Sequence, residues 1–456
     1  MSRALASTIV SDCMFRIFII VSMLLSSCKP ELNEPNYTAG DADFSVFLSI
    51  GGGTTAGMTD NALLPSGQLN SFPALLSTRF QLVNGGAFIQ PVTSLVNGFS
   101  YDFLASKGTG KTYFTNKSDC KGLLFLKSDT LPFDSASFRW LGSQGPFNNM
   151  GVPGARSFNF YSQTFGKKGL SGNPFFFRMA SDTGGTTGLS STVLGDAARV
   201  EHTFFTMWVG MEDVLFYALS GGEPSSAFFE ITPVVQFNAA VDTIVNALVA
   251  NGASGVVASI PDIEDLPYFN AIPYNGLSLT QAEADSLNQV SPPGIGFEAG
   301  LNAYVVANPG GGSIRQLGKG ELIMLNVSMD SLRCGTLGTP QRPILSTQVI
   351  DSSELALLHN AVTSYNNKLR NAATARNLAF ADMHALYKSW SRTSGYNGAA
   401  YSNAYITGGI FSSDGLHPTG RGYAIIANEF IRVINTVYKS NLPPCDVNSY
   451  AGFQFP

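Results

Sequence analysis

The fold is decided by Phe44-Ser-Val-Phe-Leu-Ser-Ile50 and by the residues that follow it directly, Gly51-Gly52-Gly53-Thr54-Thr55. A short apolar run is typical of a buried strand, and a glycine cluster at its end predicts a tight turn into the next element. The chain therefore enters its core as a strand and leaves it through a turn that brings backbone close to its neighbours.

The same pattern recurs along the chain. Further buried strands are predicted at 203–210, 255–261 and 378–382, and helices at 72–79, 237–250, 352–377 and 420–438. Strands that alternate with helices predict an α/β fold with a parallel sheet covered on both faces. Residues 263–345 fit this alternation poorly and are interpreted as an insertion over one end of the sheet, and residues 111–127 suggest a hairpin.

Functional sites in such sheets form at the carboxyl ends of the strands. The strongest local motif is Asp414-Gly-Leu-His417-Pro-Thr-Gly-Arg-Gly-Tyr423, directly before the last predicted helix. An aspartate three residues before a histidine can orient the imidazole and stabilise its protonated form, as a general base requires. Taken alone, this motif also fits a helix cap beside an ordinary surface histidine.

Several blocks, in order, resemble those of an SGNH/GDSL hydrolase (a GDSL-like lipase/acylhydrolase) of the Bacteroidetes lipoprotein type. They include Gly51–Gly57, Asn148–Arg156, Phe204–Leu215 and Asp414–His417. The resemblance spans roughly residues 41–456. It implies a three-layer αβα sandwich with a parallel, flavodoxin-like sheet, loop and hairpin insertions, and ester hydrolysis by Ser, Gly, Asn and His.

Carried over by position, the match is partial. His417 would be the general base, Asp414 its orienting acid, and Gly151 an oxyanion-hole donor through its backbone N–H. Gly53 stands where the family has its nucleophilic serine, and Glu212 stands where it has asparagine. Glycine cannot form an acyl-enzyme, and an ionised glutamate only accepts hydrogen bonds.

Other chemistry was weighed at the same positions. Thr54, Thr55 or Ser49 could replace the serine, although the family aims only one side chain. Glu212 and His417 could act on water, with the pKa of Glu212 raised by its neighbour Asp213, but a solvated loop carboxylate is the favoured interpretation. The glycine cluster also fits a dinucleotide fingerprint, yet residues 61–101 supply no acidic partner about 20 positions on. No cofactor is expected.

The first 28 residues predict an exported lipoprotein. Arg16 precedes the apolar run 17–25, which is too short to span a bilayer. Leu25-Ser-Ser-Cys28 resembles a lipobox, so Cys28 would be lipidated and would hold the protein on the cell envelope, at the outer membrane or periplasmic face. A buried helix that ends in cysteine is the alternative. Residues 29–41 predict a tether, and 42–456 the hydrolase-like domain.

Composition excludes some partners and leaves one question open. The chain has 456 residues, 44% hydrophobic and 13% charged, with a net charge of -5, so nucleic acid is not an expected partner. The four histidines and the cysteines show no metal-ligand spacing, and no structural zinc site is expected. Cys120, Cys334 and Cys445 could form one disulfide after export.

Three functions follow from these observations. The favoured one is a degenerate ester hydrolase that binds an acylated or glycan ligand in the old pocket. The second is an active esterase or acylhydrolase with non-standard machinery. The third is a structural protein of the envelope, for which the pocket is irrelevant.

Overall fold

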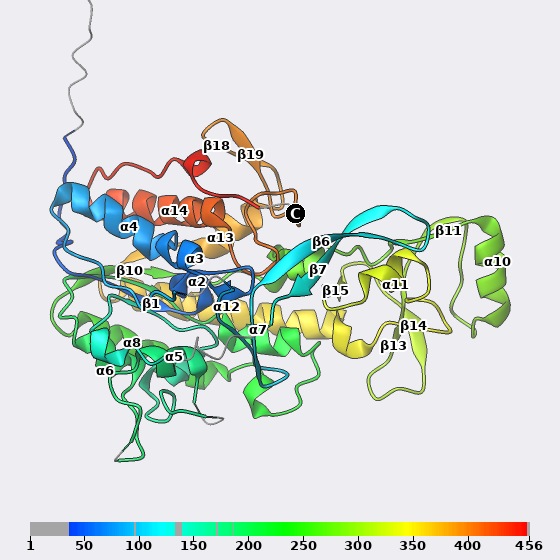
Figure 1. The fold of residues 1–456 in the computed structure, drawn as a ribbon, viewed down its shortest axis with the longest axis horizontal. Helices are drawn as coiled ribbons and strands as arrows, with labels where there is room; N and C mark the ends of the chain where they lie inside the picture. The colour runs from blue at the N-terminus through cyan, green and yellow to red at the C-terminus, as the bar shows by residue number, and fades with distance from the viewer. Residues whose placement is uncertain (1–35, 95–96, 133–138, 170–171, 186, 454–456) are drawn as a thin grey trace, which may run out of the picture. The chain divides into compact units, whose positions relative to one another are not determined.

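Five parallel strands form the central sheet, in the order β17-β10-β9-β1-β8 (Figure 1). They are β1 (Phe47–Gly51), β8 (Asn149–Gly151), β9 (Phe204–Trp208), β10 (Ser254–Ala258) and β17 (Ala379–Ala381). In sequence terms this is the 2-1-3-4-5 order of flavodoxin-like sheets, whose switch point lies between the first and third strands. In this chain those strands are β1 and β9.

This computed structural model describes residues 36–94, 97–132, 139–169, 172–185 and 187–453. The predicted signal peptide, Cys28 and most of the tether at 29–41 lie outside the described residues. The chain divides into two compact units, Met1–Tyr37 and Thr38–Pro456. Every element named below belongs to the second unit.

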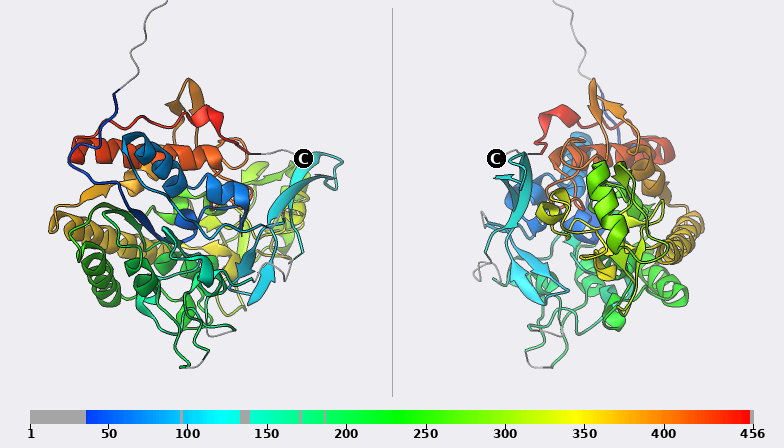
Figure 2. Two further views of the ribbon diagram at one scale, coloured as in Figure 1. Left: turned by 60° about the vertical axis from the view of Figure 1, so that its left-hand side comes forward. Right: turned by 90° about the vertical axis from the view of Figure 1, so that its right-hand side faces the viewer.

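Helices cover both faces of the sheet (Figures 1 and 2). Helices α4 (Phe72–Phe80) and α14 (Gly420–Tyr438) lie on one face, and α8 (Val234–Val249) and α12 (Ser352–Thr374) lie on the other. Aromatic rings join each pair: Phe72 stacks on Phe430 with centroids 4.7 Å apart. On the other face Phe237 stacks on Tyr365 at 3.8 Å. The predicted αβα sandwich is confirmed.

The remaining helices are shorter. They are α2 (Gly53–Ala56), α3 (Pro65–Leu69), α5 (Pro174–Met179), α6 (Val193–Ala198), α7 (Glu212–Leu219), α9 (Pro267–Asn270), α10 (Gln281–Val290), α11 (Met329–Arg333) and α13 (Met383–Ser389). No helix among the residues described here is both long and apolar enough to cross a membrane.

Small two-stranded ladders surround the sheet. They are β2 (Met58–Thr59) with β3 (Ala62–Leu63), β4 (Ser100–Asp102) with β5 (Lys107–Thr109), β6 (Thr112–Ser118) with β7 (Leu124–Thr130), β11 (Leu277–Leu279) with β12 (Gly300–Asn302), β13 (Val305–Ala307) with β14 (Ile314–Gln316), β15 (Leu322–Ile323) with β16 (Val349–Ile350), and β18 (Ser394–Tyr396) with β19 (Ala399–Tyr401).

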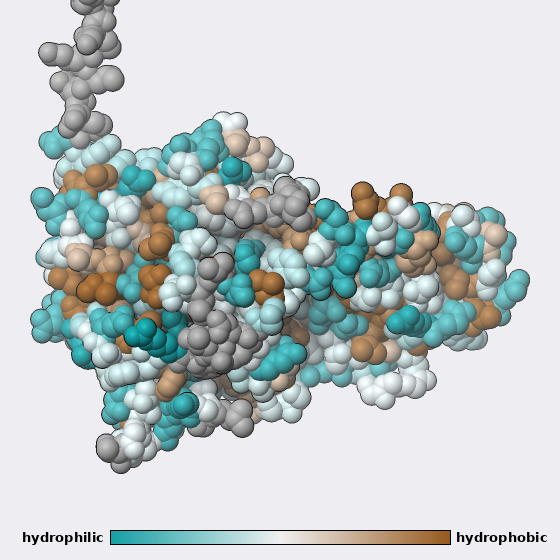
Figure 3. All heavy atoms as spheres, in the orientation of Figure 1, coloured by the Kyte–Doolittle hydropathy of each residue, from teal (hydrophilic) through white to brown (hydrophobic). Residues whose placement is uncertain are grey.

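Residues 272–349 have an apolar cluster of their own, separate from the main core. Its fully buried members include Ala284, Val305, Ile323 and Ile344. This cluster lies largely within the predicted insertion at 263–345, and its surface, together with that of the β6–β7 hairpin, carries scattered apolar patches (Figure 3). Leu123 and Leu124 at the turn of the hairpin are 59% and 75% exposed.

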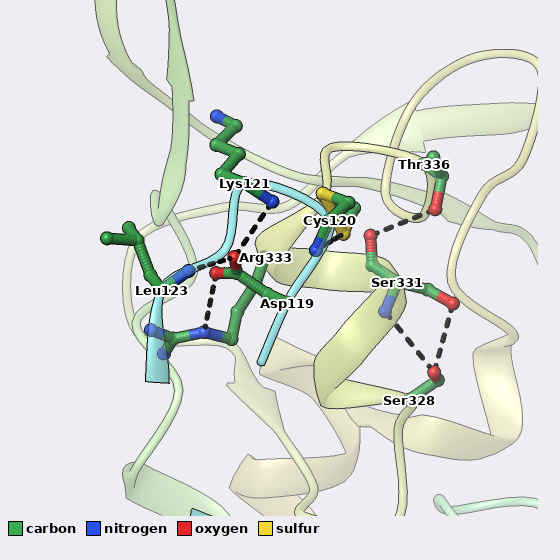
Figure 4. Close-up of a disulfide and its surroundings, with 9 residues drawn as sticks. Asp119, Cys120, Lys121, Leu123, Ser328, Ser331, Arg333 and Thr336 are labelled. Carbon is green, nitrogen blue, oxygen red and sulfur yellow. Dashed lines mark hydrogen bonds and ion pairs between the residues drawn. A yellow bond between two sulfur atoms is a disulfide. The ribbon is translucent and has the colours of Figure 1, made fainter. Parts of the chain in front are cut away.

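A disulfide between Cys120 and Cys334 ties the β6–β7 hairpin to α11 (Figure 4). The two cysteines are 214 residues apart in sequence, with Cα atoms 5.9 Å apart. Beside them, the Asp119 carboxylate faces Arg333 Nε at 3.5 Å, and the Arg333 guanidinium lies over the Phe125 ring. Cys445 is a buried free thiol, which resolves the open question of cysteine pairing.

Candidate active site

The glycine cluster forms the turn between β1 and α2, at the switch point of the sheet. Gly51 ends β1, where it pairs with Gly151 on one side and Trp208 on the other. A Cβ on Gly51 would overlap the carbonyl oxygen of Trp208, and a Cβ on Gly52 would overlap the carboxylate of Glu212. Both positions therefore need glycine because other atoms occupy the space of a side chain.

Glu212 is the first residue of α7, just beyond β9, and its side chain points back to the glycine turn. The residue is only 8% exposed, and its Oε1 accepts a hydrogen bond of 3.0 Å from the backbone N–H of Gly53. Burial raises its pKa to about 7, although the Gly53 bond and the charge of His417 lower it. The expected solvated loop carboxylate is thus wrong, and Asp213 is a smaller cause of the raised pKa than burial.

Asp414 and His417 form the predicted acid–base pair. His417 Nδ1 lies 2.7 Å from Asp414 Oδ2, and the backbone N–H groups of Leu416 and His417 each donate to Asp414 Oδ1 at 2.8 Å. Burial raises the pKa of Asp414, but the charge and hydrogen bonds of His417 outweigh it and leave that pKa below its usual value. The carboxylate therefore stays ionised and fixes the imidazole with Nε2 free to act.

The free nitrogen of His417 points at Gly53. A Cβ placed on Gly53 would lie 2.8 Å from His417 Nε2, which is closer than a Cβ can approach, so the imidazole would have to move back before a serine here could present its hydroxyl to the base. The structure thus brings together Gly53, Glu212, Asp414 and His417 at one end of the sheet, as the sequence motifs predict. What is missing is the reacting atom itself.

Gly151 occupies a different place from the one predicted. Its N–H donates to Asn149 Oδ1 at 3.0 Å, and it does not line the cavity beside Gly53. Gly154 does line that cavity, and none of the hydrogen bonds among the described residues uses its N–H. We therefore move the candidate donor from Gly151 to Gly154. Gly154 has a φ of +75°, and a Cβ there would overlap the Phe103 ring. Both features require glycine at this position.

The other hydroxyls near the turn do not replace the serine. Ser49 lies inside the sheet, where its Oγ is 2.7 Å from Thr206 Oγ1. Thr55 is 1% exposed and its hydroxyl has no hydrogen-bond partner among the described residues. Thr54 is half-buried, and within the described chain none of these three hydroxyls bonds His417.

Asp213 is a residue of this site that the motifs named without a role. It is 1% exposed and accepts hydrogen bonds of 2.8 Å from both the N–H and the hydroxyl of Ser157. Burial raises its pKa, against hydrogen bonds from Thr232 and Ser157 and the charge of Arg156. It ties the start of α7, and hence Glu212, to the segment that carries Gly154.

A cavity of about 820 Å³ opens from this site. Gly53, Glu212 and His417 lie at one end, and apolar side chains from α7, the β6–β7 hairpin and the insertion form the walls. These include Leu215, Phe216, Phe125, Ile272, Leu325 and Met329, and Phe103 between β4 and β5 adds a further apolar side chain. The disulfide of Figure 4 joins the hairpin to the insertion, two of the parts that supply these walls. Its volume is in the range that holds a small organic ligand.

One other group of side chains has metal-ligating chemistry. Ligand atoms of Asp262, Glu264 and His359 lie within 4.8 Å of one another, a grouping that sequence spacing did not show because α12 supplies the histidine. His359 Nε2 lies 2.5 Å from Glu264 Oε2, and His384 Nε2 lies 2.9 Å from Asp262 Oδ2. Two histidine–carboxylate pairs account for these contacts, with Lys388 3.9 Å from Asp262.

A flavodoxin-like sheet with an Asp-x-x-His pair beside the first strand–helix turn is the arrangement that the resemblance to SGNH/GDSL hydrolases implies. The family model for GDSL-like Lipase/Acylhydrolase matches residues 314–430. The chain therefore carries a GDSL-like lipase/acylhydrolase domain. The matched segment contains Asp414 and His417 but neither Gly53 nor Glu212. No curated protein matches the chain.

Proposed function

We propose that this chain is a degenerate member of the hydrolase family that binds an acylated or glycan ligand without forming an acyl-enzyme. The observation that supports this most is at Gly53, where no side chain meets His417 Nε2. A base with no nucleophile to deprotonate cannot start covalent acyl transfer.

Glu212 removes a second part of the chemistry. The N–H of Gly53 is the donor that the strand–helix turn would offer to a developing oxyanion, and it is already bonded to Glu212 Oε1. A carboxylate in that position adds negative charge where negative charge would develop. Loss of one oxyanion donor typically lowers the rate by roughly 10²–10³, so the change at Glu212 acts against ester hydrolysis as well as the change at Gly53.

The cavity supports binding as the remaining role. Its walls are mostly apolar, Glu212 and His417 supply polar groups beside Gly53, and a disulfide links two of the parts that form the walls. Such a shape suits a ligand with an apolar body and a polar end, as an acylated molecule has. A purely structural envelope protein would have no need for this open cavity.

One observation favours an alternative, hydrolysis by activated water. Glu212 and His417 line the same cavity, and the pKa of Glu212 is raised to about 7, which suits a general base or acid. In this alternative His417 and Glu212 would share the proton transfers to and from water, and no covalent intermediate would form.

Ester turnover separates these functions. The native chain, E212Q and H417Q are assayed with p-nitrophenyl and acetylated-sugar esters. We expect no turnover above the uncatalysed rate by any of them. Turnover by the native chain that both substitutions abolish would establish the water mechanism and overturn the binding proposal. Binding itself is measured by displacement of an apolar fluorescent probe, and failure of the native chain to bind any such probe would also overturn it.

We also propose that the protein is an envelope lipoprotein anchored through Cys28. The support is the sequence alone: an apolar run after Arg16 that ends in Leu25-Ser-Ser-Cys28. C28S should abolish lipidation and leave the domain at 42–456 correctly folded. If C28S still acquires lipid and matures as the native chain does, this proposal is wrong.

A further inference from the structure

The polarity of hydrogen bonding at the inner end of the cavity is the reverse of what ester hydrolysis needs. An ester carbonyl is an acceptor and must meet donors. Here the Gly53 N–H is taken by Glu212 Oε1, and the side chain that replaces asparagine is a carboxylate, which accepts only. What the turn and α7 now present to a ligand is an acceptor.

The Glu212 carboxylate has few competing partners. The backbone N–H of Gly53 donates to its Oε1, and no side chain among the described residues donates to it. The groups that act on its charge are Asp213 on its own helix and His417 across the site, which is itself paired with Asp414. The only basic residues that line the described cavity are His417 and Arg333, and Arg333 faces Asp119.

The two ends of the cavity thus differ in chemistry. At one end the carboxylate of Glu212 is buried and has no lysine or arginine beside it. Apolar walls from Phe216, Ile272 and Met329 form another part of the cavity. A buried carboxylate that accepts hydrogen bonds only from backbone N–H groups and has no side-chain donor is costly, so a ligand group that donates to Glu212 would be stabilised there. A ligand group that carries a carboxylate would be repelled.

On this geometry, and resting on the proposed function, we propose that the cavity selects an amphiphile whose polar head donates hydrogen bonds, a hydroxyl or an ammonium group, to Glu212. Its apolar body lies under the disulfide-linked hairpin and insertion. The substitution of Asn by Glu in this family position has therefore changed the preferred head group from an acceptor to a donor.

The experiment compares three ligands that share an octyl chain and differ only in the head: octylamine, octyl glucoside and octanoate. Each is titrated below its micelle concentration into the native chain and into E212Q, and heats of binding are measured at pH 8. We expect octylamine and octyl glucoside to bind the native chain at least about 10-fold more tightly than octanoate, since one charge-assisted hydrogen bond corresponds to about 1.5–3 kcal/mol. In E212Q the difference between octylamine and octanoate should fall to within a few-fold.

Each outcome decides one point. Equal binding of the three ligands to the native chain would overturn this inference and leave the proposed binding function standing. A preference for donors that persists in E212Q would also overturn it, because Glu212 would not be its source. If none of the three binds, the proposed function fails as well. H384Q, a change in a different cluster, is the matched control and should leave the native order intact.

Discussion

On the function we propose, the two sides of the candidate site depart to different extents from the pattern of the family that the sequence resembles. On one side, Asp414 and His417 keep the geometry of a working base, with a 2.7 Å bond between them. On the other, the turn at Gly53 has no hydroxyl, and Glu212 has replaced the neutral amide with a buried carboxylate. The base thus persists beside a position that has nothing for it to activate.

Asp414 has structural contacts besides its bond to the imidazole. Asp414 accepts hydrogen bonds from the backbone N–H of Asn61, Leu416 and His417 as well as from the imidazole. It therefore holds two segments of backbone, the turn at Asn61 and the loop at 416–417, whether or not chemistry occurs. Gly53 contributes one backbone hydrogen bond, to Glu212, and a side chain there would overlap only His417 Nε2 within 3 Å.

Restoring the diverged side should produce the largest effect. In G53S/E212N the new hydroxyl faces His417 and the Gly53 N–H becomes available to an oxyanion. We expect ester turnover at least about 10³-fold above that of the native chain. G53S alone should remain about 10²–10³-fold below the double variant, because Glu212 still occupies the donor. The two changes should therefore be strongly non-additive in a p-nitrophenyl acetate assay.

G53A/E212N is the matched control for this pair. It places the same Cβ near His417 Nε2 but supplies no hydroxyl, so it should stay at the native rate. A native chain as fast as G53S/E212N would contradict the comparison and transfer the chemistry to Thr54, Thr55 or an activated water.

Substitutions of Asp414 and His417 in the native chain should change its stability rather than its rate of ester turnover. D414N places an amide against N–H donors, and we expect it to lower the free energy of unfolding by about 3 kcal/mol. H417Q removes one bond from Asp414 and should lower it by about 1 kcal/mol. Urea unfolding at pH 7 measures both. Equal losses in the two variants would show that Asp414 is kept only to serve His417.

The pH dependence of this difference has a definite sign. The pKa of Asp414 is below its usual value in the folded chain, so its stabilising effect is present above the unfolded pKa of about 3.9. It disappears as the pH falls through the folded pKa. The gap between the native chain and D414N should therefore persist at neutral pH and close in acid.

The contribution of Glu212 to stability should depend on pH with the opposite sign and be somewhat smaller. Its folded pKa of about 7 lies above the ordinary 4.5, so the folded chain binds more protons between these values and loses stability as the pH rises through them. This corresponds to at most about 3 kcal/mol. We expect E212Q to exceed the native chain by roughly 2 kcal/mol at pH 8 and to equal it near pH 4. E298Q, at an exposed position, should change neither value.

Much of this site could be predicted from the sequence because strand, turn and helix patterns are local. The runs before Gly51 and Gly210 predicted β1 and β9, and the family blocks predicted which residues follow them. Strand β8 (Asn149–Gly151) was not predicted, because three residues show no periodicity. The predicted oxyanion-hole donor in this segment was Gly151 rather than Gly154, because only the structure shows which N–H is already bonded.

The burial of Glu212 could not be predicted either. The sequence places it beside Asp213 at the end of a strand, where loop carboxylates are commonly solvated. Its side chain occupies space that a side chain at Gly52 would need, and it accepts a hydrogen bond from Gly53. Gly53 lies 159 residues before Glu212 along the chain, so no local pattern could show this contact. The Cys120–Cys334 disulfide is equally non-local, because its partners come from a hairpin and an insertion with no shared motif.

The most direct test of the central claim is the intact mass of the native chain after incubation with a fluorophosphonate. This reagent phosphonylates a hydroxyl that a neighbouring base activates. We expect the native chain to keep its mass, and G53S/E212N to gain one phosphonyl group on residue 53. A phosphonyl group on Thr54 or Thr55 of the native chain would show that a nucleophile survives in this site and would contradict the account.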